Sequence, residues 1–292
     1  MNFSSSGVVI VDKPSGVTSH QVVSRLRRLL GTRKIGHAGT LDPMATGVLI
    51  LGVNRATRLL GHLALHDKRY LATVRLGQSS STDDADGDLV DVAPADGLLA
   101  SDVDEAAERF RGRIQQVPSA VSAIKVNGKR AYQLAREGQE VRLKAREVEV
   151  ARLEVYGVRR DGPPGTLDVE IDVECSSGTY VRALARDLGD VLGVGGHLTA
   201  LRRTRIGGYR LADAVVLGDE PPPLMSMAEA ARLSFTCVEL DSQEARDVGF
   251  GRPLTRSLPA DPTGLVGPDG ELLALYRPAP GGGCRAEAVL VG

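Results

Sequence analysis

The sequence contains no tryptophan, and aromatic residues make up only 3% of its 292 positions. Its three cysteines, Cys175, Cys237 and Cys284, lie far apart and form neither a CxxC pair nor a disulfide framework. We therefore expect a reducing, cytoplasmic location. No apolar run reaches the roughly 18 residues that a membrane helix needs, and the N-terminus lacks the basic region and apolar core of a signal peptide.

The sequence motifs of nucleotide and metal sites are missing as well. No Lys-Ser or Lys-Thr follows Gly39 or Gly47, as the phosphate-binding P-loop pattern requires. The segment that begins at Gly193 comes nearest to a dinucleotide-binding fingerprint, but it lacks the last glycine. His62 and His66 have a metal-like spacing, yet no glutamate follows His62. We expect neither a cofactor nor a bound metal.

Charge is balanced overall but unevenly distributed along the chain. The formal net charge is −1 and the pI is about 6.5, which is not typical of a simple nucleic-acid-binding protein. Ten acids and no Lys or Arg lie between Leu76 and Glu108, whereas seven basic residues and two acids lie between Lys125 and Arg146. A local basic face can bind phosphates in a nearly neutral chain. For any single cluster, an ordinary solvated face is the simpler interpretation.

Hydrophobic periodicity predicts a mixture of strands and helices. The length allows one large domain or two smaller ones. We expect Ser19 to cap the first helix, and Ser101 with Asp104 to form a capping box at a later one. The predicted strands cover 7–12, 48–51, 70–76, 148–158, 167–175, 265–266, 272–276 and 288–291, and the predicted helices cover 19–30, 56–65, 101–110, 183–191 and 226–233.

One carboxylate stands alone in a glycine-rich loop. Asp42 is the only acid between Asp12 and Asp67, and the apolar run 48–51 that follows its loop reads as a buried strand. Glycines in such a loop give its backbone conformations that other residues avoid. Asp42 also precedes a proline, and Asp-Pro is a common turn starter. Taken by itself, the turn is the favoured interpretation.

A family resemblance instead favours a functional role for Asp42. The run Gly36-His37-Ala38-Gly39-Thr40-Leu41-Asp42-Pro43, continued by Ala45-Thr46-Gly47-Val48-Leu49, resembles without a gap the catalytic motif of the TruB-type pseudouridine synthases. These enzymes isomerise uridine 55 in the T-arm of tRNA. The family's essential aspartate corresponds to Asp42, and His37 is near enough in sequence to help displace the target base from its stacked loop.

Further motifs of the same family follow along the chain. Lys68-Arg69-Tyr70 resembles the second motif, whose tyrosine stacks on the target base, although pattern alone makes Tyr70 a half-buried core residue. Ser177-Gly178-Thr179-Tyr180-Val181-Arg182 resembles the third motif, in which the arginine pairs with the catalytic aspartate and the tyrosine lines the base pocket. In the last core motif, 197–207, the leucine that packs in the pocket corresponds to Leu201. The segment 13–19 resembles the first motif, which braces the catalytic loop.

The basic stretch resembles an insertion that lies over the RNA like a thumb. We place this insertion at about 118–148, with a short helix over 132–137, and the alternative is a plain basic loop. Besides His37, Tyr180 and Leu201, the residues assigned to substrate binding are Lys13, Lys125, Lys129, Arg130 and Arg202. The acidic run 78–87 should repel phosphate, so we interpret it as scaffold.

The resemblance also implies a fold and a domain organisation. The expected class is α+β, a pseudouridine-synthase fold with a large mixed, mainly antiparallel sheet flanked by helices and a thumb-like insertion, plus a small C-terminal PUA-like β domain. The catalytic domain is predicted to span 1–225 and the PUA-like RNA-binding domain 235–292.

The chemistry agrees with the missing cofactor motifs. Pseudouridine formation breaks the N1–C1′ bond, turns the base and joins C5 to C1′, so it involves no redox change and imports no group. We predict Asp42, Tyr70 and Arg182 as the catalytic residues. Attack on C1′, addition to C6 and removal of the 2′ proton all stay open as the role of Asp42.

The predicted substrate is the T-arm stem-loop of tRNA, bound by a monomer without a membrane or a protein partner. Two other functions stay open on the sequence. One is a non-catalytic tRNA-binding or folding-assistance protein, and the other is a pseudouridine synthase that acts on another RNA.

Overall fold

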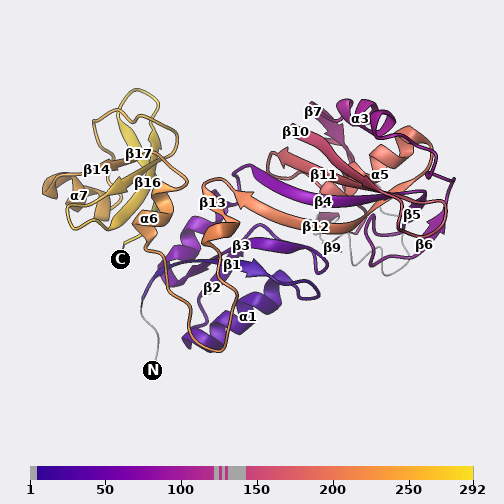
Figure 1. Ribbon diagram of the computed structural model, residues 1–292. Coiled ribbons are helices and arrows are strands. Elements are labelled where there is room, and N and C mark those ends of the chain that lie inside the picture. Colours follow the sequence, from indigo (N-terminus) through magenta and orange to yellow (C-terminus); the bar gives the residue numbers. More distant parts are fainter. Residues whose placement is uncertain (1–4, 122–124, 127–128, 131–142, 292) are drawn as a thin grey trace. The chain divides into compact units, whose positions relative to one another are not determined.

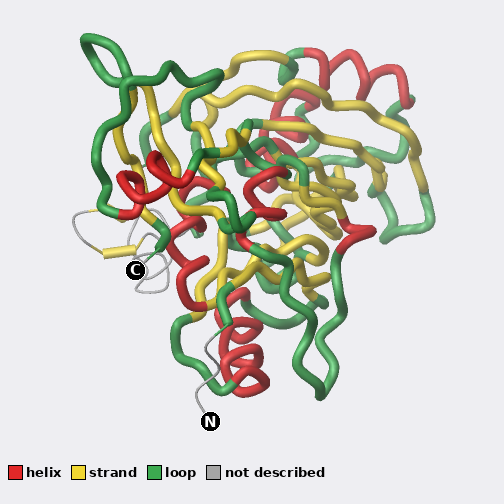
Figure 2. Tube along the Cα trace, turned by 90° about the vertical axis from the view of Figure 1, so that its left-hand side faces the viewer, coloured by secondary structure: helices red, strands yellow, loops and turns green. Residues whose placement is uncertain are grey.

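The computed structural model describes residues 5–121, 125–126, 129–130 and 143–291, and its elements are labelled in Figure 1. The chain forms two compact units. Unit 1 combines Met1–His66 with Arg205–Gly292, and unit 2 is the continuous segment Asp67–Thr204. Within the described residues, strands contain more of the chain than helices do (Figure 2). The expected α+β class is confirmed.

The N-terminal part of unit 1 is organised around an apolar central strand. β1 (Gly7–Lys13) and β2 (Ile35–Ala38) both pair antiparallel with β3 (Thr46–Val53). α1 (Ser19–Leu30) packs on this group, because its apolar positions recur at helical spacing and meet the side chains of β1 and β3. The first residue of α1 also contacts the loop that joins β2 to β3, because the Ser19 hydroxyl is hydrogen-bonded to Leu41.

The cap of α1 differs from the expectation. Thr18, not Ser19, caps the helix: its Oγ1 accepts from the Gln21 N–H at 3.1 Å, and the Gln21 side chain accepts from the Thr18 N–H at 2.7 Å. Ser19 is the first helical residue and is buried. Its hydroxyl is used elsewhere, in the loop that holds Asp42.

The remaining short elements of unit 1 also refine the predictions. The helix expected over 56–65 is a 3-10 helix, η1 (Asn54–Leu59), followed by a single turn of α-helix, α2 (Leu60–Leu63). Later in the chain come β13 (Tyr209–Arg210), η2 (Leu211–Asp213) and α6 (Met227–Arg232), the last capped by Ser226 as its capping box indicates.

The C-terminal part of unit 1 is a small sheet with one helix. β14 (Cys237–Glu239), β15 (Thr263–Val266), β16 (Leu272–Pro278) and β17 (Cys284–Val289) lie in that order, and only the β14–β15 pair is parallel. α7 (Ser242–Gly249) was missed by the sequence analysis, although Asp241 caps it by accepting two backbone N–H groups at 2.8 Å. The third predicted strand of this region is shifted, from 288–291 to β17.

This small sheet shares apolar packing with the start of the chain. One buried cluster contains Val8 and Ile10 of β1 together with Leu272, Leu275 and Leu290 from the C-terminal region. The predicted division into 1–225 and 235–292 stays a prediction, as does RNA binding by the C-terminal part.

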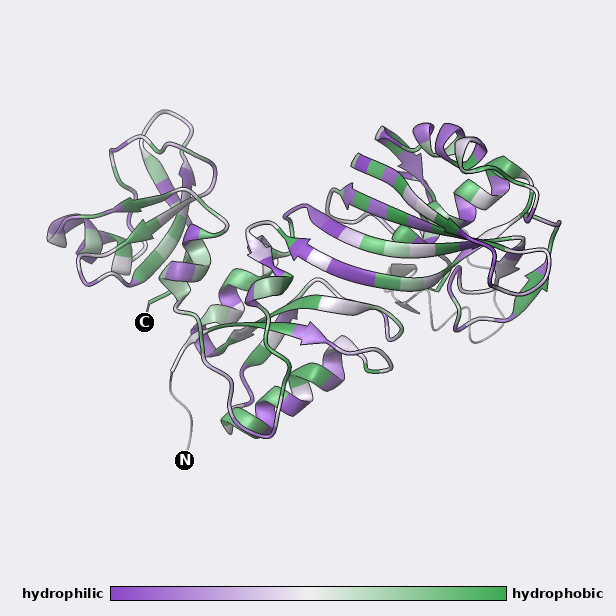
Figure 3. Ribbon diagram, in the orientation of Figure 1, coloured by the Kyte–Doolittle hydropathy of each residue, from purple (hydrophilic) through white to green (hydrophobic). Residues whose placement is uncertain are grey.

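Unit 2 is built on a sheet in the order β12-β4-β11-β10-β7. The strands are β4 (Lys68–Leu76), β7 (Gly112–Gln116), β10 (Arg146–Arg159), β11 (Leu167–Cys175) and β12 (Gly196–Ile206), and the pairs of β11 and β10 are antiparallel. Alternate residues of β4, from Lys68 to Leu76, are buried, and the alternation of hydropathy along these strands is visible in Figure 3. The last two residues of β12 belong to unit 1.

Two helices pack on one another and on this sheet, α3 (Ala100–Glu108) and α5 (Val181–Leu192). α3 begins before the expected capping box: the Asp102 carboxylate accepts from the Leu99 N–H at 2.8 Å, so Ser101 and Asp104 are not its caps. The described part of unit 2 also contains two antiparallel strand pairs, β5 (Gln78–Ser80) with β6 (Leu89–Asp91), and β8 (Lys125–Val126) with β9 (Lys129–Arg130). The helix predicted over 132–137 lies outside the described residues.

Candidate active site

The loop that carries Asp42 is anchored on its N-terminal side by α1. The buried Ser19 hydroxyl donates to the Leu41 carbonyl at 3.0 Å and accepts from the Leu41 N–H at 2.9 Å. Both polar groups of the residue before Asp42 are therefore satisfied by one side chain. Asp42 is half-buried, and its carbonyl accepts from the Ala45 N–H at 3.1 Å, which closes a turn. Ser19 was expected to cap α1 and its contact with Leu41 was not predicted, because the hydroxyls of Thr18 and Ser19 compete for the role of cap.

Lys13 supports the same loop on its other side. Its side chain is fully buried, and Nζ donates to the carbonyl oxygens of Pro14 at 2.9 Å, Val17 at 2.7 Å and Pro43 at 3.2 Å. The Gly16 N–H donates to the same Pro43 carbonyl at 2.9 Å. These contacts support the bracing role expected of the first motif. Direct substrate binding by Lys13 stays a prediction.

His37 lies in β2, two residues before a tight turn. Its side chain is half-buried, and its backbone pairs opposite Leu51 of β3. Gly39 has φ +79°, in the left-handed region that a residue with a Cβ rarely adopts, so a glycine lets the chain turn there towards Asp42. His37 thus lies in the strand that leads into the loop, and Asp42 lies within the loop itself.

The predicted base-pocket residues come from unit 2. Tyr70 lies on β4 and is 6% exposed, and Leu201 lies on the neighbouring β12 and is 8% exposed. Tyr180 is half-buried and comes directly before α5, in an extended conformation. Asp42 belongs to unit 1, so its convergence with these side chains on one pocket stays a prediction from the resemblance.

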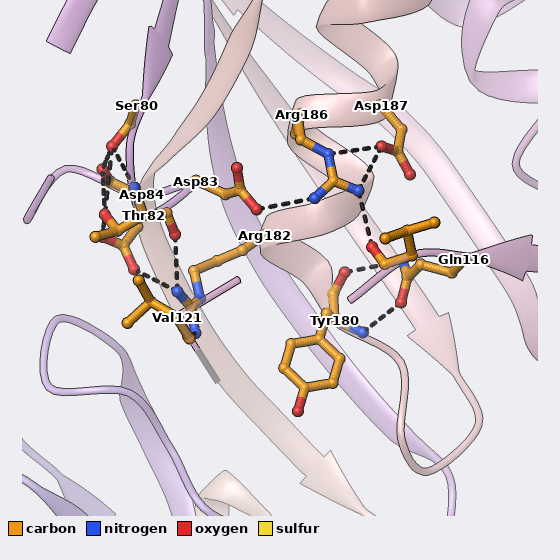
Figure 4. A network of polar contacts seen from close by, with 11 residues as sticks. Ser80, Thr82, Asp83, Asp84, Gln116, Val121, Tyr180, Arg182, Arg186 and Asp187 are labelled. Atoms are coloured by element: carbon orange, nitrogen blue, oxygen red, sulfur yellow. Dashed lines mark hydrogen bonds and ion pairs between the residues drawn. The ribbon is translucent and has the colours of Figure 1, made fainter. Parts of the chain in front are cut away.

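Arg182 is held in the first turn of α5 by three oxygen atoms. Its Nη1 lies 3.2 Å from Asp84 Oδ2 and donates to the Thr82 carbonyl at 2.8 Å, while Nη2 donates to the Val121 carbonyl at 2.9 Å (Figure 4). The Arg182 and Asp84 side chains are only 5% and 6% exposed. A buried guanidinium needs such a charged partner. The predicted pairing of Arg182 with Asp42 joins the two units and stays a prediction.

Asp84 is itself fixed by the turn in which it lies. Its Oδ1 accepts from the Thr82 hydroxyl at 2.5 Å and from the Asp86 N–H at 3.1 Å. The preceding Asp83 has φ +61° and pairs with Arg186 Nη1 at 3.1 Å, one helical turn beyond Arg182. Two consecutive acids thus face two arginines of α5. The interpretation of the acidic run as scaffold is supported, but Asp84 as the partner of Arg182 was missed, because no local pattern pairs a loop acid with a helix about 100 residues later.

The basic residues assigned to RNA occupy two places. Lys125, Lys129 and Arg130 lie in the paired strands β8 and β9, and their side chains lie outside the described part of the structure. Arg202 is half-buried on β12, next to Leu201. Their roles in substrate binding stay predictions.

A buried cationic pair lies near Tyr70 on the sheet of unit 2. Lys68 is 7% exposed and Arg203 is 1% exposed. Burial, together with the charge of Arg203, lowers the pKa of Lys68 to about 8. Burial also raises the pKa of the Cys175 thiol, which faces Lys68 across β4 and β11, to about 11. The sheet beside Tyr70 therefore carries a lysine that loses its proton more readily than usual.

Comparisons with known proteins agree with the motifs. Residues 27–181 match the family described as TruB family pseudouridylate synthase (N terminal domain). The chain belongs to the TruB family of pseudouridine synthases. It is therefore an isomerase of uridine in RNA. Residues 182–219 match the tRNA pseudouridylate synthase B C-terminal domain, and residues 235–291 match the tRNA pseudouridine synthase II C-terminal region.

Individual relatives cover the whole chain. It is 56% identical to a protein named tRNA pseudouridine synthase B from Cutibacterium acnes, over 100% of both chains. A protein of the same name from a Mycobacterium species is 55% identical, over 98% of this chain and 95% of the relative. Among solved structures, a chain in the crystal structure of a Cbf5–Nop10–Gar1 complex is 25% identical with a TM-score of 0.73, covering 99% of this chain and 85% of that one. The expected pseudouridine-synthase fold is confirmed.

No group of three or more His, Cys, Asp or Glu side chains within the described residues is arranged to hold a metal ion. In the same part of the chain, none of the helices has the length and apolar character needed to cross a membrane.

Proposed function

We propose that this chain converts uridine 55 in the T-arm loop of tRNA to pseudouridine, with Asp42 as the essential carboxylate. The observation that carries the proposal is the gapless motif 36–49, which places Asp42 in an anchored loop between β2 and β3. The names of the relatives from Cutibacterium acnes and Mycobacterium support tRNA as the substrate.

The reaction needs a carboxylate close to the sugar and C6, and a pocket for a base taken out of its stack. Asp42 supplies the carboxylate, and Ser19 and Lys13 hold the backbone on either side of it. Because a displacement of about 1 Å can reduce a catalytic rate about 100-fold, such anchoring of the loop is part of the catalytic design.

The remaining residues have roles around the base. Tyr70, Tyr180 and Leu201 form the pocket, and His37 helps to displace the uridine from the stacked loop. Arg182 pairs with Asp42 and keeps it ionised. Lys125, Lys129, Arg130 and Arg202 contact phosphates of the T-arm, and the protein acts as a cytoplasmic monomer without a protein partner.

The test combines a transcript assay with mapping in cells. A tRNA transcript labelled with tritium at C5 of uridine releases tritium when C5 joins C1′, and the matched control carries cytidine at position 55. We expect release from the first transcript only, and none with Asp42→Asn, whose tRNA binding stays near that of the wild type. Loss of a pseudouridine in another RNA, with position 55 unchanged in cells that lack the protein, would contradict the proposed substrate.

A further inference from the structure

Two residues that face one another lie close to the two ends of the predicted insertion at about 118–148. Gln116 is the last residue of β7 and Arg146 is the first of β10, and they are direct cross-strand partners in the antiparallel ladder. Side chains opposite one another in such a pair lie on the same face of the sheet. Both side chains reach Tyr180, which precedes α5.

Gln116 holds the backbone of Tyr180. Its side chain is fully buried, Nε2 donates to the Tyr180 carbonyl at 3.0 Å, and Oε1 accepts from the Tyr180 N–H at 2.8 Å (Figure 4). Tyr180 is the N-cap residue of α5, and its own side chain makes no capping hydrogen bond. Two reciprocal bonds from one amide therefore fix the residue at which the chain turns into the helix.

Arg146 holds the ring of the same residue. Its guanidinium carbon lies 4.8 Å from the centre of the Tyr180 ring, a cation–π geometry, and Nη2 donates to the Gly178 carbonyl. Gly178 has φ +87°, which only a glycine adopts readily, and this turn presents its carbonyl to Arg146. The ring is thus restrained by one partner and the backbone by the other.

The residues that follow β7 are also hydrogen-bonded to α5. Arg186 Nη2 donates to the Val117 carbonyl at 2.8 Å, and Arg182 Nη2 donates to the Val121 carbonyl at 2.9 Å (Figure 4). Hydrogen bonds therefore connect residues 117–121, which follow β7, to the first two turns of α5.

We propose that Gln116 and Arg146 are positioning residues for the isomerisation, a clamp that sets the peptide and the ring of Tyr180. The inference rests on the proposed function, which assigns Tyr180 to the base pocket.

Single substitutions test each half of the clamp. Gln116→Leu removes both bonds to Tyr180, whereas Gln116→Glu keeps the acceptor for the Tyr180 N–H and loses the donor. In single-turnover assays with the full chain and tRNA, we expect Gln116→Leu to slow pseudouridine formation between 10-fold and 100-fold, in the range of a misplaced group, with Gln116→Glu between it and the wild type. The dissociation constant for tRNA should change less than about threefold.

The neighbouring residue offers a matched control. Gln115 lies on the same strand, is exposed, and faces away from the buried side of Gln116. Gln115→Leu should leave the rate unchanged. If Gln116→Leu fails to fold, Gln116→Glu and Arg146→Met still test the clamp. Equal rates for the wild type, Gln116→Glu and Arg146→Met would overturn it.

A double-mutant cycle tests whether Arg146 acts through the ring. Arg146→Met should slow the single-turnover rate in the wild type and have no further effect in a Tyr180→Leu background. If Arg146 were only a phosphate contact, Arg146→Met would slow the reaction in the Tyr180→Leu background as well, and it would lower the salt dependence of tRNA binding. An inactive wild-type protein would instead refute the proposed function, whereas an active wild type with unaffected clamp variants would refute only the clamp.

Discussion

Replacing Asp84 with asparagine should disable Arg182 without changing the size of the side chain. Asp84 Oδ1 accepts from both the Thr82 hydroxyl and the Asp86 N–H, so the asparagine oxygen must take that place. Its NH₂ group then occupies the position of Oδ2, which lies 3.2 Å from Arg182 Nη1. Two donors would face each other in a buried site, and the guanidinium would lose its described charged partner.

The expected cost follows from the burial of the pair. Removing one partner of a buried ion pair costs about 3–5 kcal/mol, and Arg182 keeps two carbonyl contacts, so we expect about 3 kcal/mol of lost stability. A shift of the guanidinium should lower kcat about 100-fold with tRNA affinity nearly unchanged. Urea denaturation measures the first effect, and tritium release with filter binding measures the second.

The control lies one residue earlier in the chain. Asp83→Asn makes the same chemical change on the pair with Arg186, whose side chains are 12% and 25% exposed. Asparagine tolerates the positive φ of this position, and we expect Asp83→Asn to cost less stability than Asp84→Asn, because the pair with Arg186 is more exposed. The reasoning fails if both variants lose the same activity, or if Asp84→Asn keeps a kcat near that of the wild type.

Three further outcomes are expected. Arg182→Ala should reduce kcat more than Arg202→Ala, which should mainly weaken tRNA binding and its salt dependence, as kinetics at two salt concentrations will show. Ser19→Ala should destabilise the fold by about 1–3 kcal/mol in urea denaturation and slow turnover, because the buried backbone of Leu41 loses both bonds. Lys68→Met should stabilise the protein at pH 7 by at most about 3 kcal/mol. This gain should shrink between pH 8 and 10.5, because the folded protein releases the Lys68 proton in this range before the unfolded chain does. A difference in urea midpoints that stays constant with pH would contradict the lowered pKa of Lys68.

Local patterns predicted only part of the large sheet: β1, β3, β4, β10 and β11 were expected, whereas β2, β7 and β12 were not. β11 has the predicted bounds, 167–175, because apolar alternation with period 2 is a direct signature of a half-buried strand. The elements of the C-terminal region were harder to predict. α7 is short and lies in a segment rich in glycine and proline, so only the cap at Asp241 marks its start.

Tertiary partners explain the other differences. Thr18 and Ser19 are equally good caps by type, and the contact of Ser19 with Leu41 decides between them. Asp84 could be placed in an acidic scaffold from charge alone, but its partner Arg182 follows about 100 residues later. The motif located Asp42 in its loop, whereas the residues that hold the loop in place required the packed structure.

The discontinuity of unit 1 has a consequence for the order of events on the ribosome. Residues 67–204 form a continuous unit and can fold as soon as they have left the exit tunnel. The first strand cannot complete its packing so early, because Val8 and Ile10 share an apolar cluster with Leu275 and Leu290 near the end of the chain. β1 is therefore made early in synthesis, but its apolar packing is complete only after residues 272–290 have been made.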